Sequence, residues 1–230
     1  MLLTTTQFRV RPDRTRAFER GVRRVVERAE AEQETRCWYT RRVRAGSINK
    51  YYLSLPTPEW ASQGAIAPID RFIEHLFGEE EGSRIVDELW ECLESAYRSV
   101  AELRTDLSVP EDGRDDFEAP IAMLTRFSPT PAGWEDCERL YAHLREAIGK
   151  LDDRRRYGVY QTRIGDLTEL WESVPLDDLS QLDGWRTREE LLEQAFGPQR
   201  GREIHRAFLR GMQSAERELG HLRPDLSHVP

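Results

Sequence analysis

The sequence has few lysines and no long apolar run, and each shortage argues against a class of function. Lys50 and Lys150 are the only lysines among 34 basic residues, and no basic stripe stands out. We therefore expect no nucleic-acid partner. No apolar stretch approaches the ~20 residues of a transmembrane helix, and the first ten residues lack the pattern of a signal peptide. These features predict a soluble, cytoplasmic protein without a membrane partner.

Cysteine is also scarce. Cys37, Cys92 and Cys137 lie far apart, form no CxxC pair and have no histidine at ligand spacing. We expect free, buried thiols and no metal site. The sequence contains no HExxH, GxSxG, Walker or GxGxxG motif. No cofactor is expected from motifs, and no catalytic residue can be named.

What the chain does contain is enough apolar sequence for folded domains. Its 230 residues are 38% hydrophobic and 9% aromatic, and the formal net charge is −8. Five acids and one arginine in "PEDGRDDFEAP", residues 110–120, carry half of that charge. This polar segment, with a proline at each end, has the composition of a linker.

An internal repeat explains the rest of the chain. "LRTDLS" begins at Leu103 and "LRPDLS" at Leu222, so the two phrases are 119 residues apart. The same shift aligns residues 6–108 with the second half without a gap; it places Phe8 on Phe127, for example. We therefore predict two repeats of one structural unit, residues 1–109 and 121–230, joined by an acidic linker at 110–120.

Each repeat has the pattern β-α-β-β-α-α. Alternating residues predict strands at 2–10, 36–44 and 49–55, and at 121–127, 155–163 and 168–174. A helix follows the first strand, and a long helix is expected near the end of each repeat. The apolar stripe of the long helix is Ile85, Leu89, Leu93, Ala96, Val100 and Leu103, matched by Ile204, Phe208, Met212, Ala215, Leu219 and Leu222.

The segments "LRTDLS" and "LRPDLS", called the closing phrases below, are expected to end each repeat. They are interpreted either as a short fourth strand or as a cap, with Leu107 and Leu226 buried. Asp106 and Asp225 are expected to form local backbone hydrogen bonds. The fold class is α+β, with two ferredoxin-like units packed sheet to sheet and helices outside.

This tandem arrangement resembles the dimeric α/β-barrel superfamily, in its fused form. The group includes antibiotic-biosynthesis-monooxygenase-like and NIPSNAP-like proteins and haem-binding relatives of chlorite dismutase. The resemblance covers nearly the whole chain and rests on topology and duplication. It implies a barrel that one chain builds alone, which predicts a monomeric pseudo-dimer, with a homodimer as the alternative.

The space between the two sheets is the expected ligand site. Alternation places Tyr51, Leu53 and Leu55 beneath helices, and likewise Leu170 and Val174. Residues on the opposite strand faces form a set of aromatic, hydroxyl and arginine side chains suited to a flat, partly apolar ligand, or else filling the space between the sheets. The candidate ligand-binding residues are Tyr39, Arg41, Tyr52, Ser54, Tyr160, Trp171 and Ser173.

Three functions are compatible with this sequence. The first is a non-enzymatic binder of a small molecule. The second is a cofactor-independent, monooxygenase-like enzyme acting on an aromatic substrate in the same space. The third, which the resemblance suggests, is a haem protein, for which His143 or His205 on an expected helix would be the axial ligand. The absence of a convergent acid–base set favours the binder.

Overall fold

The computed structural model describes residues 1–64, 66–109 and 117–230. They form two compact units. Unit 1 consists of Met1–Ala101 together with Gly220–Pro230, and unit 2 is Glu102–Leu219. Of the linker expected at 110–120, residues 110–116 lie outside the described residues.

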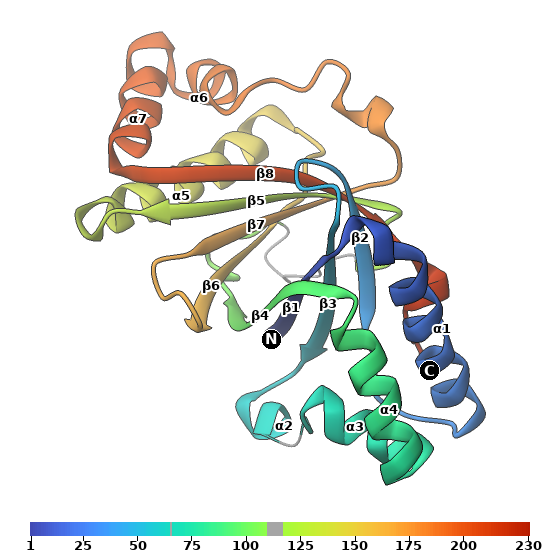
Figure 1. Ribbon diagram of the computed structural model, residues 1–230. Helices are drawn as coiled ribbons and strands as arrows, with labels where there is room; N and C mark the ends of the chain where they lie inside the picture. The colour runs from blue at the N-terminus through green and yellow to red at the C-terminus, as the bar shows by residue number, and fades with distance from the viewer. Residues whose placement is uncertain (65, 110–116) are drawn as a thin grey trace. The chain divides into compact units, whose positions relative to one another are not determined.

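Unit 1 is a sheet with helices on one face (Figure 1). Its sheet is built from β1 (Leu2–Val10), β2 (Tyr39–Ala45), β3 (Lys50–Thr57) and most of β4 (Leu93–Leu103). Its helices are α1 (Thr15–Ala31), α2 (Trp60–Gly64), α3 (Ile69–Phe77) and α4 (Glu79–Trp90). The core forms where apolar side chains of α1, α3 and α4 meet the helix-covered face of β1 and β3.

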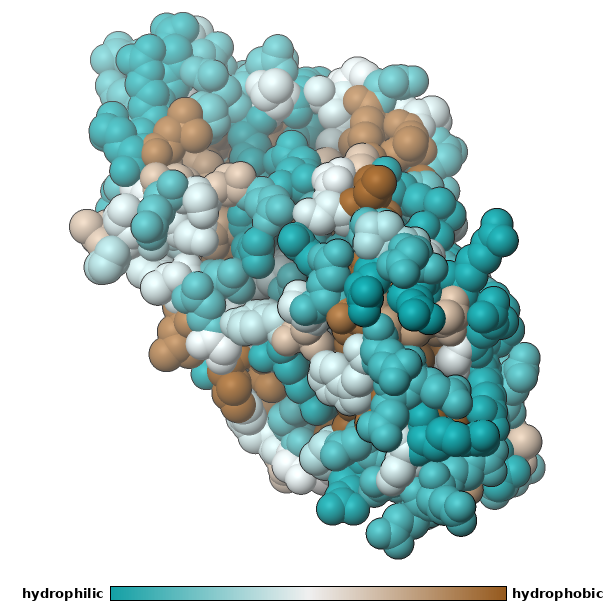
Figure 2. Space-filling model, viewed as in Figure 1, coloured by the Kyte–Doolittle hydropathy of each residue, from teal (hydrophilic) through white to brown (hydrophobic). Residues whose placement is uncertain are grey.

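Unit 2 repeats this plan. Its strands are β5 (Ile121–Pro129), β6 (Gly158–Ile164), β7 (Leu170–Leu176) and most of β8 (Met212–Leu222). Its main helices are α5 (Trp134–Leu151), α6 (Arg188–Phe196) and α7 (Pro198–Gly211). A single large core of buried residues joins α5, α6 and α7 to β5 and β7. The surface seen in Figure 2 is mostly hydrophilic, as the high content of charged residues requires.

Strand pairing follows the same register in both units. β3 pairs antiparallel with β1 and β2, and β7 pairs antiparallel with β5 and β6. Thr6 faces Leu53 across β1 and β3, and Thr125 faces Glu172 across β5 and β7. The hydrogen-bonded order of the strands is the closed order β1-β3-β2-β8-β5-β7-β6-β4. The predicted α+β class of two ferredoxin-like units is confirmed.

The prediction of a long helix near the end of each repeat is wrong. Helix α4 ends at Trp90 and α7 at Gly211, and each is followed by an 11-residue strand, β4 or β8. The apolar residues after the helix end happen to keep a spacing of three and four, which sequence alone reads as more helix. The strands form because each pairs with neighbouring strands that are distant in sequence, and the periodicity of apolar residues does not report such partners.

The helix ends are fixed by backbone contacts that recur in both units. The Arg11 N–H donates to the Cys92 carbonyl oxygen at 2.9 Å, and the Thr130 N–H donates to the Gly211 carbonyl oxygen at 2.8 Å. Gly211 also touches Gly133 so closely that a Cβ on Gly133 would lie 2.0 Å from the Gly211 oxygen. These contacts stop the helix and turn the chain into the strand.

The closing phrases are exchanged between the units. Leu107, in the first repeat, is part of unit 2 and is buried in its core, whereas Leu226, in the second repeat, is part of unit 1 and is buried there. The predicted burial of Leu107 and Leu226 is confirmed. The Leu226 carbonyl oxygen accepts hydrogen bonds from Trp38 Nε1 at 3.1 Å and Thr40 Oγ1 at 2.7 Å. The compact units therefore differ from the sequence repeats at their ends.

The aspartates of the closing phrases are held mainly by an arginine side chain, and Asp106 also has the local backbone hydrogen bond that was expected. Asp106 accepts two hydrogen bonds from the Arg104 guanidinium, at 2.9 and 2.7 Å. Asp225 accepts the same pair from Arg223, at 2.8 Å each. A guanidinium two residues earlier offers paired donors that match a carboxylate, which backbone N–H groups at this turn do not.

Candidate ligand cavity

The sequence-predicted ligand residues lie on the strand faces that point away from the helices. The helix-facing assignment behind this prediction is confirmed, because Tyr51, Leu53 and Leu55 pack with α1 and α3, and Leu170 and Val174 pack with α5 and α6. The structure places Tyr39, Arg41, Tyr52 and Ser54 in unit 1, and Tyr160, Trp171 and Ser173 in unit 2. Their role in binding a ligand stays a prediction.

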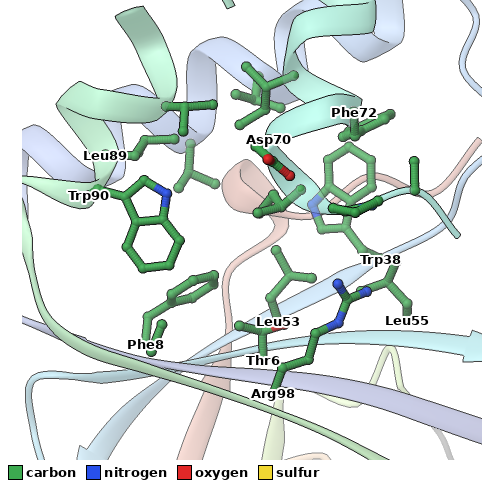
Figure 3. A pocket seen from close by; sticks show the side chains of 18 of the residues that line it. Thr6, Phe8, Trp38, Leu53, Leu55, Asp70, Phe72, Leu89, Trp90 and Arg98 are labelled. Atoms are coloured by element: carbon green, nitrogen blue, oxygen red, sulfur yellow. The ribbon is translucent and has the colours of Figure 1, made fainter. Parts of the chain in front are cut away.

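A cavity of about 300 Å³ lies on the other face of the unit 1 sheet, between the strands and the helices (Figure 3). This volume falls at the lower end of the range for sites that take small organic ligands. Aromatic and aliphatic side chains supply most of its wall. Those labelled in Figure 3 are Phe8, Trp38, Leu53, Leu55, Phe72, Leu89 and Trp90.

Three helices and the strands of unit 1 position this wall. Helix α1 contributes Phe18, Val22 and Val25, which follow the helical spacing of four and three and so share one face. Helices α3 and α4 and the strands close the other sides. Several aromatic rings stabilise the lining by tilted or edge contacts; for example, the centroids of Trp38 and Phe72 are 5.8 Å apart.

A few polar side chains also line the cavity. Arg98 and Thr6 lie on its strand side, and Asp70 lies on its helix side (Figure 3). The Arg36 guanidinium stacks over the Phe72 ring, 4.0 Å from its centroid. Burial lowers the pKa of Arg36 from its usual value; the nearby Glu34 opposes this shift and Arg98 adds to it. The guanidinium of Arg36 remains charged, because arginine starts from a very high pKa.

The corresponding space of unit 2 is filled by polar side chains. The Tyr141 hydroxyl donates to Glu172 Oε2 at 2.9 Å, and Arg188 Nη2 donates to Glu172 Oε1 at 2.6 Å. Burial opposes ionisation of Glu172, but the Arg188 guanidinium and these hydrogen bonds outweigh it and lower its pKa below the usual value. Burial raises the pKa of Tyr141 far above its usual value. We call these three residues the unit 2 triad.

At the positions 119 residues earlier, unit 1 has no polar group in place of the triad. Val22 corresponds to Tyr141, Leu53 to Glu172 and Ile69 to Arg188. All three unit 1 residues line the cavity. The apolar side chains at these positions are shorter than those of the triad and line a space that the triad occupies in unit 2.

The sequence prediction missed this cavity, although its signal is present in the repeat. Aligning the two halves shows three apolar residues opposite a tyrosine, a glutamate and an arginine. Buried polar side chains must pair with one another, so this mismatch indicates that the three residues are partners in the second repeat and are replaced together in the first. Only the packing of α1 and α3 on the sheet shows that the three positions share one space.

The lining of the cavity offers few groups that could hold haem or a metal ion. Its described residues include no histidine, cysteine or methionine, and Tyr97, which is exposed, is the one lining residue of a type that can serve as an axial haem ligand. His143 is half-buried and hydrogen-bonded to the Arg139 carbonyl oxygen, and His205 is paired with Glu189 and stacked on Phe208. No three metal-binding side chains come together among the described residues.

The cysteines are free, as expected. Cys92 and Cys137 are buried, and Cys37 is partly exposed. Burial raises the pKa of Cys137 to about 12, which keeps it as a thiol at neutral pH. Within the described part of the chain, no helix has the length and apolar character to cross a membrane.

Comparison with known proteins gives structural relatives only. No family model and no curated protein sequence matches the chain. A candidate monooxygenase from Fusobacterium nucleatum subsp. nucleatum is 9% identical, with a TM-score of 0.58 over 96% of this chain and 91% of its own. An anthrone oxidase-like protein is 12% identical, with a TM-score of 0.55 and the same coverage of both chains.

A third relative is the candidate chlorite dismutase TA0507, 13% identical, with a TM-score of 0.52 over 97% of this chain and 95% of its own. Identities this low carry information about fold and not about activity. The relatives match over nearly their full length, in agreement with the two repeats and the closed strand order. The chain therefore has the fold of these structures, with both ferredoxin-like repeats in one polypeptide, as the resemblance to the dimeric α/β-barrel superfamily implies.

Proposed function

We propose that unit 1 binds a small, mainly apolar molecule in the cavity between its sheet and helices α1, α3 and α4. The observation that carries this proposal is the difference between the units. The same place in unit 2 is filled by the triad, and in unit 1 it is a space of about 300 Å³ lined by aromatic and aliphatic side chains. Such walls favour a ligand with a ring or a short chain.

Binding, without catalysis, is the function proposed. Among its described lining residues the cavity has a single carboxylate, Asp70, and no histidine or cysteine, and no hydrogen bond pairs Asp70 with the exposed Tyr97. Monooxygenase-like chemistry and a haem site therefore remain hypotheses suggested by the fold. The monomeric state and the cytoplasmic location remain predictions from the sequence.

The test uses a neutral aromatic probe, N-phenylnaphthylamine, whose fluorescence rises in apolar surroundings. The wild-type protein is titrated beside Val22→Phe, which places a ring in the cavity. We expect the variant to bind at least tenfold more weakly, because the ring occupies the ligand's space. It should still fold, since unit 2 accommodates a tyrosine at the matching position.

Ala31→Phe is the matched control. It adds the same ring to the exposed last residue of α1, outside the cavity. This variant should bind like the wild type. Equal binding by Val22→Phe and the wild type would overturn the proposal, because the probe would then sit elsewhere.

A further inference from the structure

Arg217 and Arg98 occupy matching positions in the two repeats, 119 residues apart. In unit 2, Arg217 Nε donates to Thr125 Oγ1 at 3.0 Å. Thr125 pairs across the strands with Glu172, and the negative charge of Glu172 acts on Arg217. Unit 2 thus supplies an internal carboxylate next to this arginine and threonine.

Unit 1 keeps the arginine and the threonine without the carboxylate. Thr6 pairs across the strands with Leu53, in the register of Thr125 with Glu172. Within the part of the chain that the structure describes, the Arg98 side chain makes no hydrogen bond and no ion pair. Arg98 and Thr6 both line the cavity, and the Arg98 side chain reaches toward it from the strand side (Figure 3).

The charges around the cavity favour an anion on this side. Arg98 and Arg36 are the lining cations, and they are close enough for Arg98 to act on Arg36 electrostatically. Asp70, the lining carboxylate, lies across the cavity on the helix side (Figure 3). The strand side therefore has a surplus of positive charge beside apolar walls.

We propose that the ligand of this cavity carries a carboxylate, which Arg98 binds with the Thr6 hydroxyl, while its apolar part lies among the aromatic side chains. This inference rests on the function proposed above. The ligand carboxylate would take the part that Glu172 plays in unit 2. Arg98 is an exposed residue at the strand side of the cavity, and its guanidinium presents paired donors that fit both oxygens of a carboxylate.

Calorimetric titration with naphthylacetate and naphthylacetamide tests this class of ligand. The two molecules have nearly the same shape and differ in charge. At neutral pH we expect the wild type to bind the acid about tenfold more tightly than the amide, as a charge-assisted hydrogen bond implies. Arg98→Gln should lose this preference and keep its affinity for the amide. Arg98→Lys should retain part of the preference.

Arg84→Gln is the matched control, since Arg84 is exposed on α4 and does not line the cavity. It should bind both molecules like the wild type. Equal binding of acid and amide by the wild type would overturn the carboxylate inference and leave the binding function intact. A preference that survives Arg98→Gln would also overturn it. Failure of both molecules, and of the neutral fluorescent probe, would instead overturn the proposed function.

Discussion

The space between sheet and helices is filled in unit 2 and open in unit 1, although both units come from one repeated sequence. Unit 2 spans the space with a buried carboxylate, its guanidinium partner and a phenol. Unit 1 lines it with shorter apolar side chains. The distinguishing positions are Val22, Leu53 and Ile69 in unit 1 and Tyr141, Glu172 and Arg188 in unit 2.

The difference shows that two copies of one structural unit can differ in a property such as stability or the space left for a ligand. An open cavity forfeits the dispersion contacts that its lining would otherwise make, so it costs stability. A filled space removes that cost, but a buried ion pair must recover its own desolvation through good geometry. Unit 2 meets this condition, and unit 1 keeps the space available for a ligand. The predictions below test how far this division goes.

The largest effect is expected from breaking the triad. Glu172→Gln leaves Arg188 with a neutral partner in a buried site, which should cost about 4 kcal/mol of unfolding free energy. Hydrogen exchange of unit 2 peptides measures this loss. Leu53→Gln in unit 1 is the matched change, and it faces a cavity rather than a buried cation. Equal losses in the two variants would show that the triad is no more critical than the cavity wall.

The next largest loss of stability is expected from removing the buried leucines of the closing phrases, Leu107 and Leu226. Leu226→Ala should destabilise unit 1 by about 3 kcal/mol, and Leu107→Ala should destabilise unit 2 by a similar amount, because both side chains are buried. Peptide-resolved hydrogen exchange distinguishes the units. If Leu226→Ala instead loosened the second repeat, the exchange of closing phrases between units would be refuted.

A smaller effect is expected from the phenol of the triad. Tyr141→Phe removes a hydrogen bond to a buried carboxylate and should cost about 1.5 kcal/mol. Denaturant unfolding monitored in unit 2 measures it. Tyr157→Phe is the control, because the Tyr157 hydroxyl is buried and has no hydrogen-bond partner among the residues that the structure describes. That variant should be neutral or slightly stabilising, and a loss as large as that of Tyr141→Phe would contradict this assignment.

Acid should reduce the difference between wild type and Glu172→Gln. The folded-state pKa of Glu172 lies below its usual value of 4.5, so its ionised form stabilises the folded state above that pH. This stabilisation is lost as the pH falls below 4.5 and through the lower folded-state pKa. Unfolding measured at decreasing pH should show the two proteins converging. A difference that stays constant down to the lowest pH at which the protein folds would exclude Glu172 as its source.

Much of this fold could be predicted from the sequence. The fixed shift between "LRTDLS" and "LRPDLS" revealed the repeat, and alternation at Tyr51, Leu53 and Leu55 identified the helix-covered strand face. Both signals are local or strictly periodic. The strands after Trp90 and Gly211 could not be recognised in this way, because their partners lie far away in sequence and their apolar spacing imitates a helix.

The cavity was harder to predict for a different reason. Val22, Leu53 and Ile69 are ordinary core residues when each is read alone. Their meaning depends on the partners that are missing, which only the second repeat supplies. The predicted ligand residues, from Tyr39 to Ser173, came from the opposite strand face, where aromatic side chains are conspicuous in sequence. The sequence shows residue types directly, whereas a cavity depends on how residues that are distant in sequence pack together.

The exchange of closing phrases has a consequence for how the chain is made. Unit 2 is one continuous segment, Glu102–Leu219, whereas unit 1 needs both the start of the chain and Gly220–Pro230. A polypeptide leaves the ribosome from its N-terminus onward. Unit 1, although most of it is synthesised first, can therefore complete its fold only after Gly220–Pro230 have been made, and all of unit 2 precedes that segment. The unit that holds the open cavity is expected to finish folding after the unit in which the same space is filled.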